Sequence, residues 1–124
     1  MRSRRSGPDV VDRTRFEELV SEALDSLPDW VLERMDNVEV IVEDRPPRDE
    51  PNLLGRYHGI PLTSKGEFYS GAVLPDTITL YKRTIERVSR DEEHLREVVA
   101  HTIVHEVAHH FGISDDRLRE IDRY

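Results

Sequence analysis

The sequence predicts a single α+β domain, in which a small mixed sheet of three to four strands packs on one long central helix. Residues 38–43 and 76–81 are rich in β-branched residues and have the composition of strands. An uninterrupted helical pattern runs over residues 91–111, and 124 residues is the size of one domain. Because the long helix is apolar on most sides, we expect it at the centre of the fold.

Residues 1–13 are expected to form a flexible basic arm, and residues 14–124 a single domain. Ser3-Arg4-Arg5 suggests a twin-arginine export signal, but the next residues, Ser6-Gly7-Pro8-Asp9, are not the apolar stretch that such a signal requires. No apolar run in the sequence approaches the roughly 18 residues of a membrane span. We therefore expect a cytoplasmic protein that does not contact a membrane.

The charge and the cysteine content exclude several classes of function. The chain has 26 acidic and 18 basic residues, which give a formal net charge of −8. Nucleic acid is therefore not an expected partner, since its binding relies on a net-basic surface. The absence of cysteine excludes disulfides, thiol nucleophiles and thiolate metal sites. Any metal ion must be held by His, Asp or Glu.

The shorter elements are assigned from apolar spacing and from helix breakers. Apolar residues at spacings of three and four predict a helix that begins at a capping box of Thr14 and Glu17 and ends at Pro28. In chain order, the other expected elements are a short helix over residues 29–35, a loop over 44–52, a weak strand over 55–60, a turn over 63–71, one helical turn over 84–88 and a short final helix capped by Ser114 or Asp115.

The long helix has one polar notch on an otherwise apolar surface. Ser89 and Glu92 are spaced as its N-terminal cap, and Gly112 suits its end. On a helical wheel, the apolar arc contains Val99, Ala100, Ile103, Val104, Val107 and Phe111. His109 lies about 40° and Glu106 about 100° from His105, so we expect these three residues to face a cleft.

Residues 105–109, His-Glu-Val-Ala-His, form an H-E-x-x-H motif on this helix. Two histidines four residues apart lie one turn apart, so both imidazoles can bind one metal ion. Glu106 lies beside them without pointing at the metal. A carboxylate there can take a proton from metal-bound water and pass it to a leaving amine. The motif therefore predicts a zinc site with Glu106 as the general base.

A zinc site usually has at least three protein ligands, and the sequence offers a third one after the helix. Gly112 can end the helix in a left-handed conformation and reverse the chain, so that Asp115, three residues later, reaches the same ion. The complete pattern is H-E-x-x-H-x-x-G-x-x-D. The other interpretation of Asp115 is a helix cap without metal contact.

This motif resembles that of the zincin metallopeptidases, in the metzincin-like form that has Asp in place of a third His. The whole chain resembles a small bacterial family of zincin-like metallopeptidases, because residues 75–81 also precede the helix as in that family. The resemblance implies one zincin-like domain over residues 14–124. It also implies that an extended substrate pairs with an edge strand, for which residues 76–81 are the candidate. Unlike metzincins, the chain has no methionine after the motif, since Met1 and Met35 both precede it.

The same resemblance implies a set of site residues: Zn²⁺ bound by His105, His109 and Asp115, with Glu106 as the catalytic base. Larger zincins of another branch take their third ligand from a glutamate on a later helix, and Glu120 is the alternative of that kind here. Asp116 is a further alternative, with a helix cap as its other interpretation.

Other histidines and tyrosines near the motif have weaker arguments. His101 lies one turn before the motif, too far along the helix for three histidines to share one ion, so it is assigned to the surface or to a supporting contact. His110 falls in the apolar arc and is expected to be a hydrogen-bonded core histidine. Tyr57 or Tyr81 could stabilise an oxyanion, although each is more often a packing residue.

The predicted function is zinc-dependent hydrolysis of peptide bonds in an unidentified peptide or protein. One alternative is a zinc-stabilised protein-interaction module with little or no proteolytic activity, and another is hydrolysis of a non-peptide amide. The coordination number distinguishes the peptidase from the interaction module, since a structural zinc site is closed by four protein ligands and a catalytic site keeps an open position.

Overall fold

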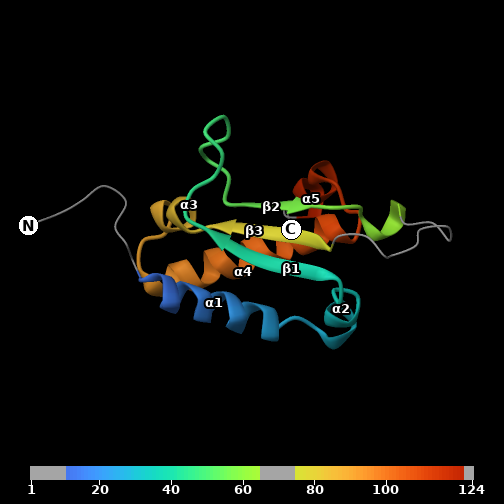
Figure 1. The fold of residues 1–124 in the computed structure, drawn as a ribbon, viewed down its shortest axis with the longest axis horizontal. Coiled ribbons are helices and arrows are strands. Elements are labelled where there is room, and N and C mark those ends of the chain that lie inside the picture. Colours follow the sequence, from blue (N-terminus) through green and yellow to red (C-terminus); the bar gives the residue numbers. More distant parts are fainter. Residues whose placement is uncertain (1–10, 65–74, 122–124) are drawn as a thin grey trace, which may run out of the picture.

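The computed structural model describes residues 11–64 and 75–121, and these form the predicted α+β fold with a small mixed sheet (Figure 1). The elements in chain order are α1 (Arg13–Asp25), α2 (Asp29–Glu33), β1 (Val38–Glu43), β2 (Gly55–His58), the 3-10 helix η1 (Leu62–Ser64), β3 (Asp76–Tyr81), α3 (Lys82–Arg87), α4 (Glu92–His110) and α5 (Asp115–Ile121). Most of the turn expected over residues 63–71, and most of the arm expected over residues 1–13, lie outside the described residues. None of the helices in the described ranges has the length and apolar character needed to cross a membrane.

Strand β3 lies at the centre of the sheet, between the two other strands. β1 pairs with it in parallel, with Val38 opposite Asp76, and β2 pairs with it antiparallel, with Gly55 opposite Leu80. The expectation that residues 76–81 pair with a substrate is therefore wrong, because β1 and β2 already occupy both edges of this strand. Strand β2 is instead the edge strand next to the C-terminal half of α4.

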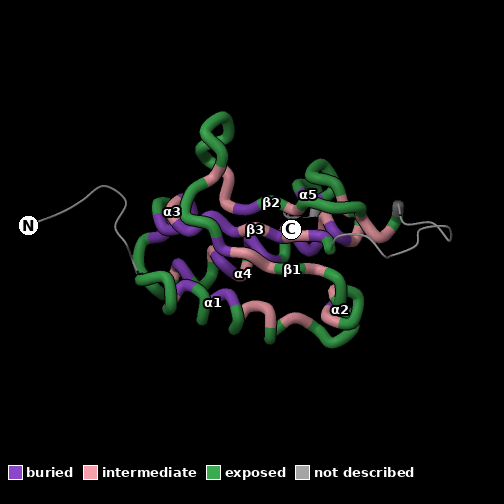
Figure 2. Tube along the Cα trace, viewed as in Figure 1, coloured by how far each residue is buried: buried purple, intermediate pink, exposed green. Residues whose placement is uncertain are grey.

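Helix α4 packs on the sheet and against α1, and Figure 2 shows buried segments of these elements along the centre of the fold. The fully buried side chains of this core include Phe16, Leu19, Ile78, Leu80, Ile85, Leu95, Val99 and Ile103. Val104 is 53% exposed, so the apolar arc is not buried over its whole width. Val104 lies at the margin of that arc, and the sheet and α1 cover only one side of the helix.

The cap of α1 differs from the one that the sequence predicts. Asp12 is the N-cap residue, and its carboxylate accepts a hydrogen bond from the backbone N–H of Arg15 at 2.9 Å. Thr14 therefore lies inside the helix, and the capping box of Thr14 and Glu17 is wrong. The helix begins earlier because an aspartate satisfies the free N–H groups of the first turn as well as a threonine does.

At α4, too, the N-cap residue is an aspartate and not the residue that the sequence predicts. Asp91 caps this helix by accepting the backbone N–H of His94 at 2.8 Å. Ser89 does not cap it, because the Ser89 hydroxyl is buried and donates to the backbone oxygen of Ile85 at 2.7 Å. The spacing of a serine and a glutamate was thus a weaker signal than an aspartate placed directly before the helix.

Candidate metal centre

The C-terminal end of α4 brings the two motif histidines and Asp115 together. The rings of His105 and His109 lie one turn apart, with their centroids separated by 5.0 Å. Their Nε2 atoms face the same oxygen, Oδ1 of Asp115, at 3.1 Å and 2.9 Å. One ligand atom from each of the three residues lies within 4.8 Å of the others. The three side chains are therefore placed as one possible metal site.

The chain reversal after α4 explains why Asp115 reaches the histidines. Gly112 has a φ of +89°, and the backbone N–H of Ile113 donates to the carbonyl of Ala108 at 2.9 Å. This pair of features is the Schellman type of helix end, which turns the chain back over the last turn. Ser114 then caps α5 by accepting the backbone N–H of Arg117 at 3.2 Å. Asp115 is thus the first residue of α5 and not its cap.

Gly112 is also required by packing. A Cβ atom at this position would lie 2.3 Å from the hydroxyl oxygen of Thr63, which is closer than any real contact. Thr63 belongs to η1 and lines the same cleft as the histidines. Both the backbone conformation and the neighbouring chain therefore demand glycine here.

The arrangement of the three side chains fits a single metal ion. Ligand atoms about 2.0–2.2 Å from one tetrahedral zinc ion are separated by roughly 3.3 Å. The distances of 3.1 Å and 2.9 Å from the two Nε2 atoms to Oδ1 of Asp115 are close to that separation. Two imidazole nitrogens and one carboxylate oxygen are also a donor set that divalent transition metals accept, and three protein ligands leave one position open.

Glu106 lies on α4 between the histidines in sequence, and it is buried at the wall of the same cleft. Its exposed fraction is 7%, and it accepts a hydrogen bond from the backbone N–H of Tyr57 on β2. Burial raises the pKa of Glu106 above its ordinary value, against the opposite effects of His109, His105 and this backbone N–H. The carboxylate is therefore held in place as a stronger proton acceptor than an exposed glutamate.

Asp115 has the opposite shift, although its partial burial alone would raise its pKa. Attraction to His109 and His105, together with hydrogen bonds from both rings, outweighs that burial and lowers the pKa of Asp115. The two carboxyl groups of the site therefore differ in chemistry. Asp115 is stabilised as an anion beside the histidines, and Glu106 is the one poised to take up a proton.

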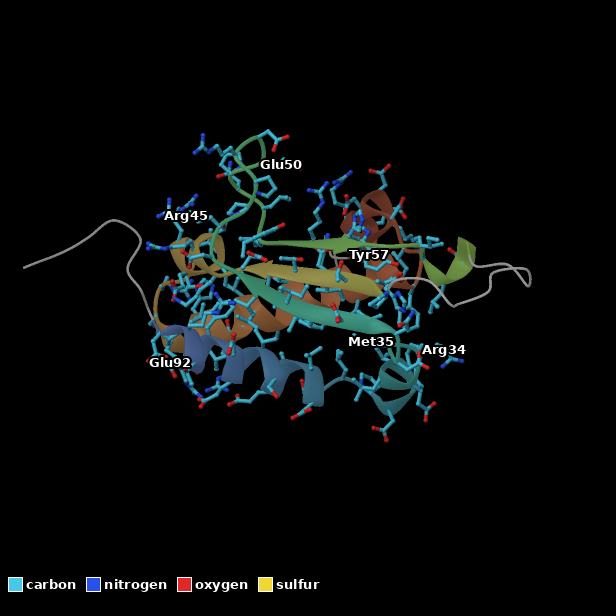
Figure 3. The ribbon with its side chains drawn as sticks, in the orientation of Figure 1. Arg34, Met35, Arg45, Glu50, Tyr57 and Glu92 are labelled. Carbon is cyan, nitrogen blue, oxygen red and sulfur yellow. The ribbon has the colours of Figure 1, made fainter. Side chains whose placement is uncertain are left out.

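These residues line a cleft of about 500 Å³ between α4, β2, η1 and the start of α5. Glu50 and Leu53 of the loop after β1 and Pro61, just before η1, also line it, together with Arg56 of β2 and Thr63 of η1. Figure 3 shows Tyr57 on β2, and this residue also lines the cleft. The prediction that the polar notch of the long helix faces a cleft is confirmed.

A buried polar network surrounds His110, the residue that follows His109 on α4. His110 is 1% exposed, and its Nδ1 lies 3.1 Å from Oδ2 of Asp76, while its Nε2 lies 2.9 Å from the backbone oxygen of Arg34. The Tyr57 hydroxyl donates to the same Oδ2 at 2.6 Å. The expectation of a hydrogen-bonded core histidine at position 110 is confirmed.

The role of Asp76 was missed by sequence reasoning. Asp76 lies on the same buried face of β3 as Ile78 and Leu80, because alternate residues of a strand share a face. An acidic residue on a buried face requires a polar partner, and this requirement could have been inferred from the sequence. His110, in the apolar arc of the long helix, is the complementary signal. Because Tyr57 donates its hydroxyl to Asp76, that hydroxyl is directed to the network and not to the metal ligands.

The alternative ligands lie elsewhere. Glu120 accepts a hydrogen bond from Arg117 at 2.8 Å, and Asp116 pairs with Arg119, both on the exposed surface of α5. His101 is exposed on α4, one turn before the motif. Tyr81 is buried, which raises its pKa, and it is not part of the cleft wall. Among the described residues, the structure brings only His105, His109 and Asp115 into a cluster of possible ligands.

Comparison with known protein families matches residues 35–124 of this chain to the zincin-like metallopeptidases. The matched range contains the whole cleft and most of the chain. The chain belongs to the zincin-like metallopeptidase family. Membership implies a metal ion at the site, and the site described above has donors for one. A search of curated proteins found no match to this sequence.

The fold of this zincin-like chain also occurs in a solved structure. It is similar to a conserved hypothetical protein from Thermus thermophilus, with a TM-score of 0.57 and 23% sequence identity. The alignment covers 82% of this chain and 94% of that chain. At this identity the similarity supports the fold alone.

Proposed function

We propose that this zincin-like protein is a zinc-dependent peptidase, with His105, His109 and Asp115 as metal ligands and Glu106 as the general base. The observation that carries the proposal is a cluster of three ligand atoms beside a buried carboxyl group, all on one cleft. Zinc, when bound there, would supply a Lewis acid for the scissile carbonyl and lower the pKa of water. The donor set, with one open position, supports a catalytic ion over a structural one.

Glu106 would move the proton in this reaction. The N–H of Tyr57 fixes the carboxylate, and burial raises its pKa, which brings its basicity closer to that required at neutral pH. The proton taken from the attacking water would then pass to the leaving amine. A glutamine at position 106 keeps the size of the side chain but cannot accept a proton.

The outer edge of β2 would hold the substrate backbone. In an antiparallel pair, successive residues point their N–H and C=O groups alternately toward the partner strand and away from it. The N–H of Tyr57 points away from β3, since it donates to Glu106, so the backbone groups of Gly55 face the same side. An extended peptide added at this edge would lie along the cleft that contains the histidines.

The experiment compares wild-type protein with three variants. We expect about one zinc ion per chain by elemental analysis, and its loss in His105→Ala. Glu106→Gln should retain zinc and lose cleavage of a peptide library, by about a hundredfold or more as expected for removal of a general base. Glu97→Gln, an exposed glutamate on the same helix, is the matched control and should change neither property.

Two results would contradict the proposal. Cleavage that survives in Glu106→Gln would remove this residue from the role of base, and zinc that survives in His105→Ala would place the metal elsewhere. A zinc-loaded wild type that cleaves nothing in the library would instead favour a zinc-stabilised interaction module.

A further inference from the structure

A second pocket, of about 410 Å³, lies between α3 and the loop that follows β1. Four arginines line it: Arg45 and Arg48 from the loop, and Arg83 and Arg87 from α3. Among the described residues, its remaining wall consists of three prolines, and no carboxylate is part of it. Figure 3 shows Arg45 on the α3 side of this loop and Glu50 near its tip. Four guanidinium groups therefore surround one concave site in a chain whose net charge is −8.

Most of these charges have no acidic partner. Within the described residues, no carboxylate oxygen forms an ion pair with Arg45, Arg48 or Arg87. The arginines elsewhere that do form ion pairs are Arg13, Arg15, Arg56, Arg96, Arg117 and Arg119. Among the described residues, Arg83 alone of the four pocket arginines has a carboxylate within ion-pair distance, so the pocket favours an anion.

Contacts within the chain hold the walls of the pocket in place. The backbone N–H of Arg83 donates to the carbonyl of Asp44 at 3.0 Å, and Nε of Arg83 lies 3.7 Å from the Asp44 carboxylate. These contacts join the start of the loop to the start of α3. Pro46, Pro47 and Pro51 restrict the backbone of the loop between them. Binding would therefore order little of the chain, which favours affinity for a small ligand.

We propose that this arginine pocket binds a small molecule that carries two or more phosphate charges. The planar guanidinium fork donates two parallel hydrogen bonds to phosphate oxygens, and four such groups exceed what a single carboxylate requires. A pocket of about 410 Å³ has room for a pyrophosphate or for a larger group with two phosphates. A nucleic-acid chain is disfavoured, because Asp49 and Glu50 follow directly in the same loop and the protein has no net-basic surface.

This site is separate from the metal centre, although the two share a wall. Glu50 and Leu53 face the metal cleft, whereas Arg45 and Arg48 of the same loop face the arginine pocket. The proposal therefore does not depend on peptidase activity, and it remains testable if the protein cleaves nothing.

The experiment is calorimetric titration with pyrophosphate at constant ionic strength. We expect one saturable site per chain in the wild type, with binding at least about a hundredfold weaker in the double variant Arg45→Ser/Arg87→Ser, since each charge-assisted contact contributes about tenfold. Arg90→Ser is the matched control, because Arg90 is exposed and lies outside the pocket. Pyrophosphate can also bind a zinc ion, so binding at the metal centre must be excluded. His109→Ala removes a proposed metal ligand, and this variant should bind pyrophosphate with the same affinity as the wild type. Far-UV circular dichroism checks the fold of each variant, and Arg48→Ser replaces the double variant if that one is unfolded.

Several outcomes would overturn the proposal. They are the absence of saturable binding, equal weakening in Arg90→Ser, and loss of binding in His109→Ala, which would place pyrophosphate on the metal. A short single-stranded oligonucleotide or an oligoglutamate peptide that binds more tightly than pyrophosphate, through the same arginines, would also refute a small phosphate ligand.

Discussion

Removal of the Asp76 carboxylate tests the buried network that supports the metal centre. In Asp76→Ala, three donors among the described residues lose their acceptor: the His110 ring, the Tyr57 hydroxyl and the backbone N–H of Ile60. The side chains of His110 and Asp76 are 2% and 4% exposed, so water does not replace the missing oxygen atoms easily. The perturbation therefore breaks a buried, hydrogen-bonded pair from one side.

The expected magnitude follows from the contacts of His110. A neutral imidazole has one N–H, but both ring nitrogens lie against acceptors, Asp76 on one side and the Arg34 carbonyl on the other. Asp76→Ala leaves the buried donors around this carboxylate without their acceptor. A buried donor left unpaired costs about 1–3 kcal/mol, so the three donors together predict a loss of at least about 3 kcal/mol of unfolding free energy. That is a large part of the roughly 5–15 kcal/mol that stabilises a typical domain.

The assay is urea unfolding followed by circular dichroism. Tyr57→Phe removes one donor and should cost about 1 kcal/mol, whereas Asp116→Ala removes only an exposed pair with Arg119 and should cost less than about 0.5 kcal/mol. The predicted order of destabilisation is thus Asp76→Ala, then Tyr57→Phe, then Asp116→Ala. A loss below about 1 kcal/mol in Asp76→Ala would refute the reasoning, because it would mean that the buried donors find other partners.

Two further predictions concern the approach of Asp115 to the histidines. Asp115→Asn should weaken zinc binding at least about tenfold in competition with a chromophoric chelator, whereas Asp116→Asn should not, since Asp116 pairs with Arg119 on the exposed side of α5. Equal affinities of the two variants would exclude Asp115 as a ligand. Gly112→Ala should lower the unfolding free energy by at least about 1–2 kcal/mol, because alanine is strained at a φ of +89° and its Cβ meets Thr63. Unchanged urea midpoints would show that the helix end adapts to a side chain.

Much of the fold was predictable because it depends on local pattern. The strands over Val38–Glu43 and Asp76–Tyr81 have the predicted bounds, since β-branched composition acts within a few residues. The long helix and the reversal at Gly112 also follow from local periodicity and backbone preference. Element ends were less accurate: the short strand ends at His58 rather than at position 60, because Gly59 has a φ of +156°.

The sequence by itself therefore determined the elements and the spacing that brings His105, His109 and Asp115 within reach of one another, since all three lie in one short stretch of chain. Only the tertiary structure decided which strand is the sheet edge, which acid faces His110, and which arginines share a pocket. These features join residues that are far apart along the chain. Their contact depends on how the whole chain buries its apolar surface, and no local window of sequence contains that information.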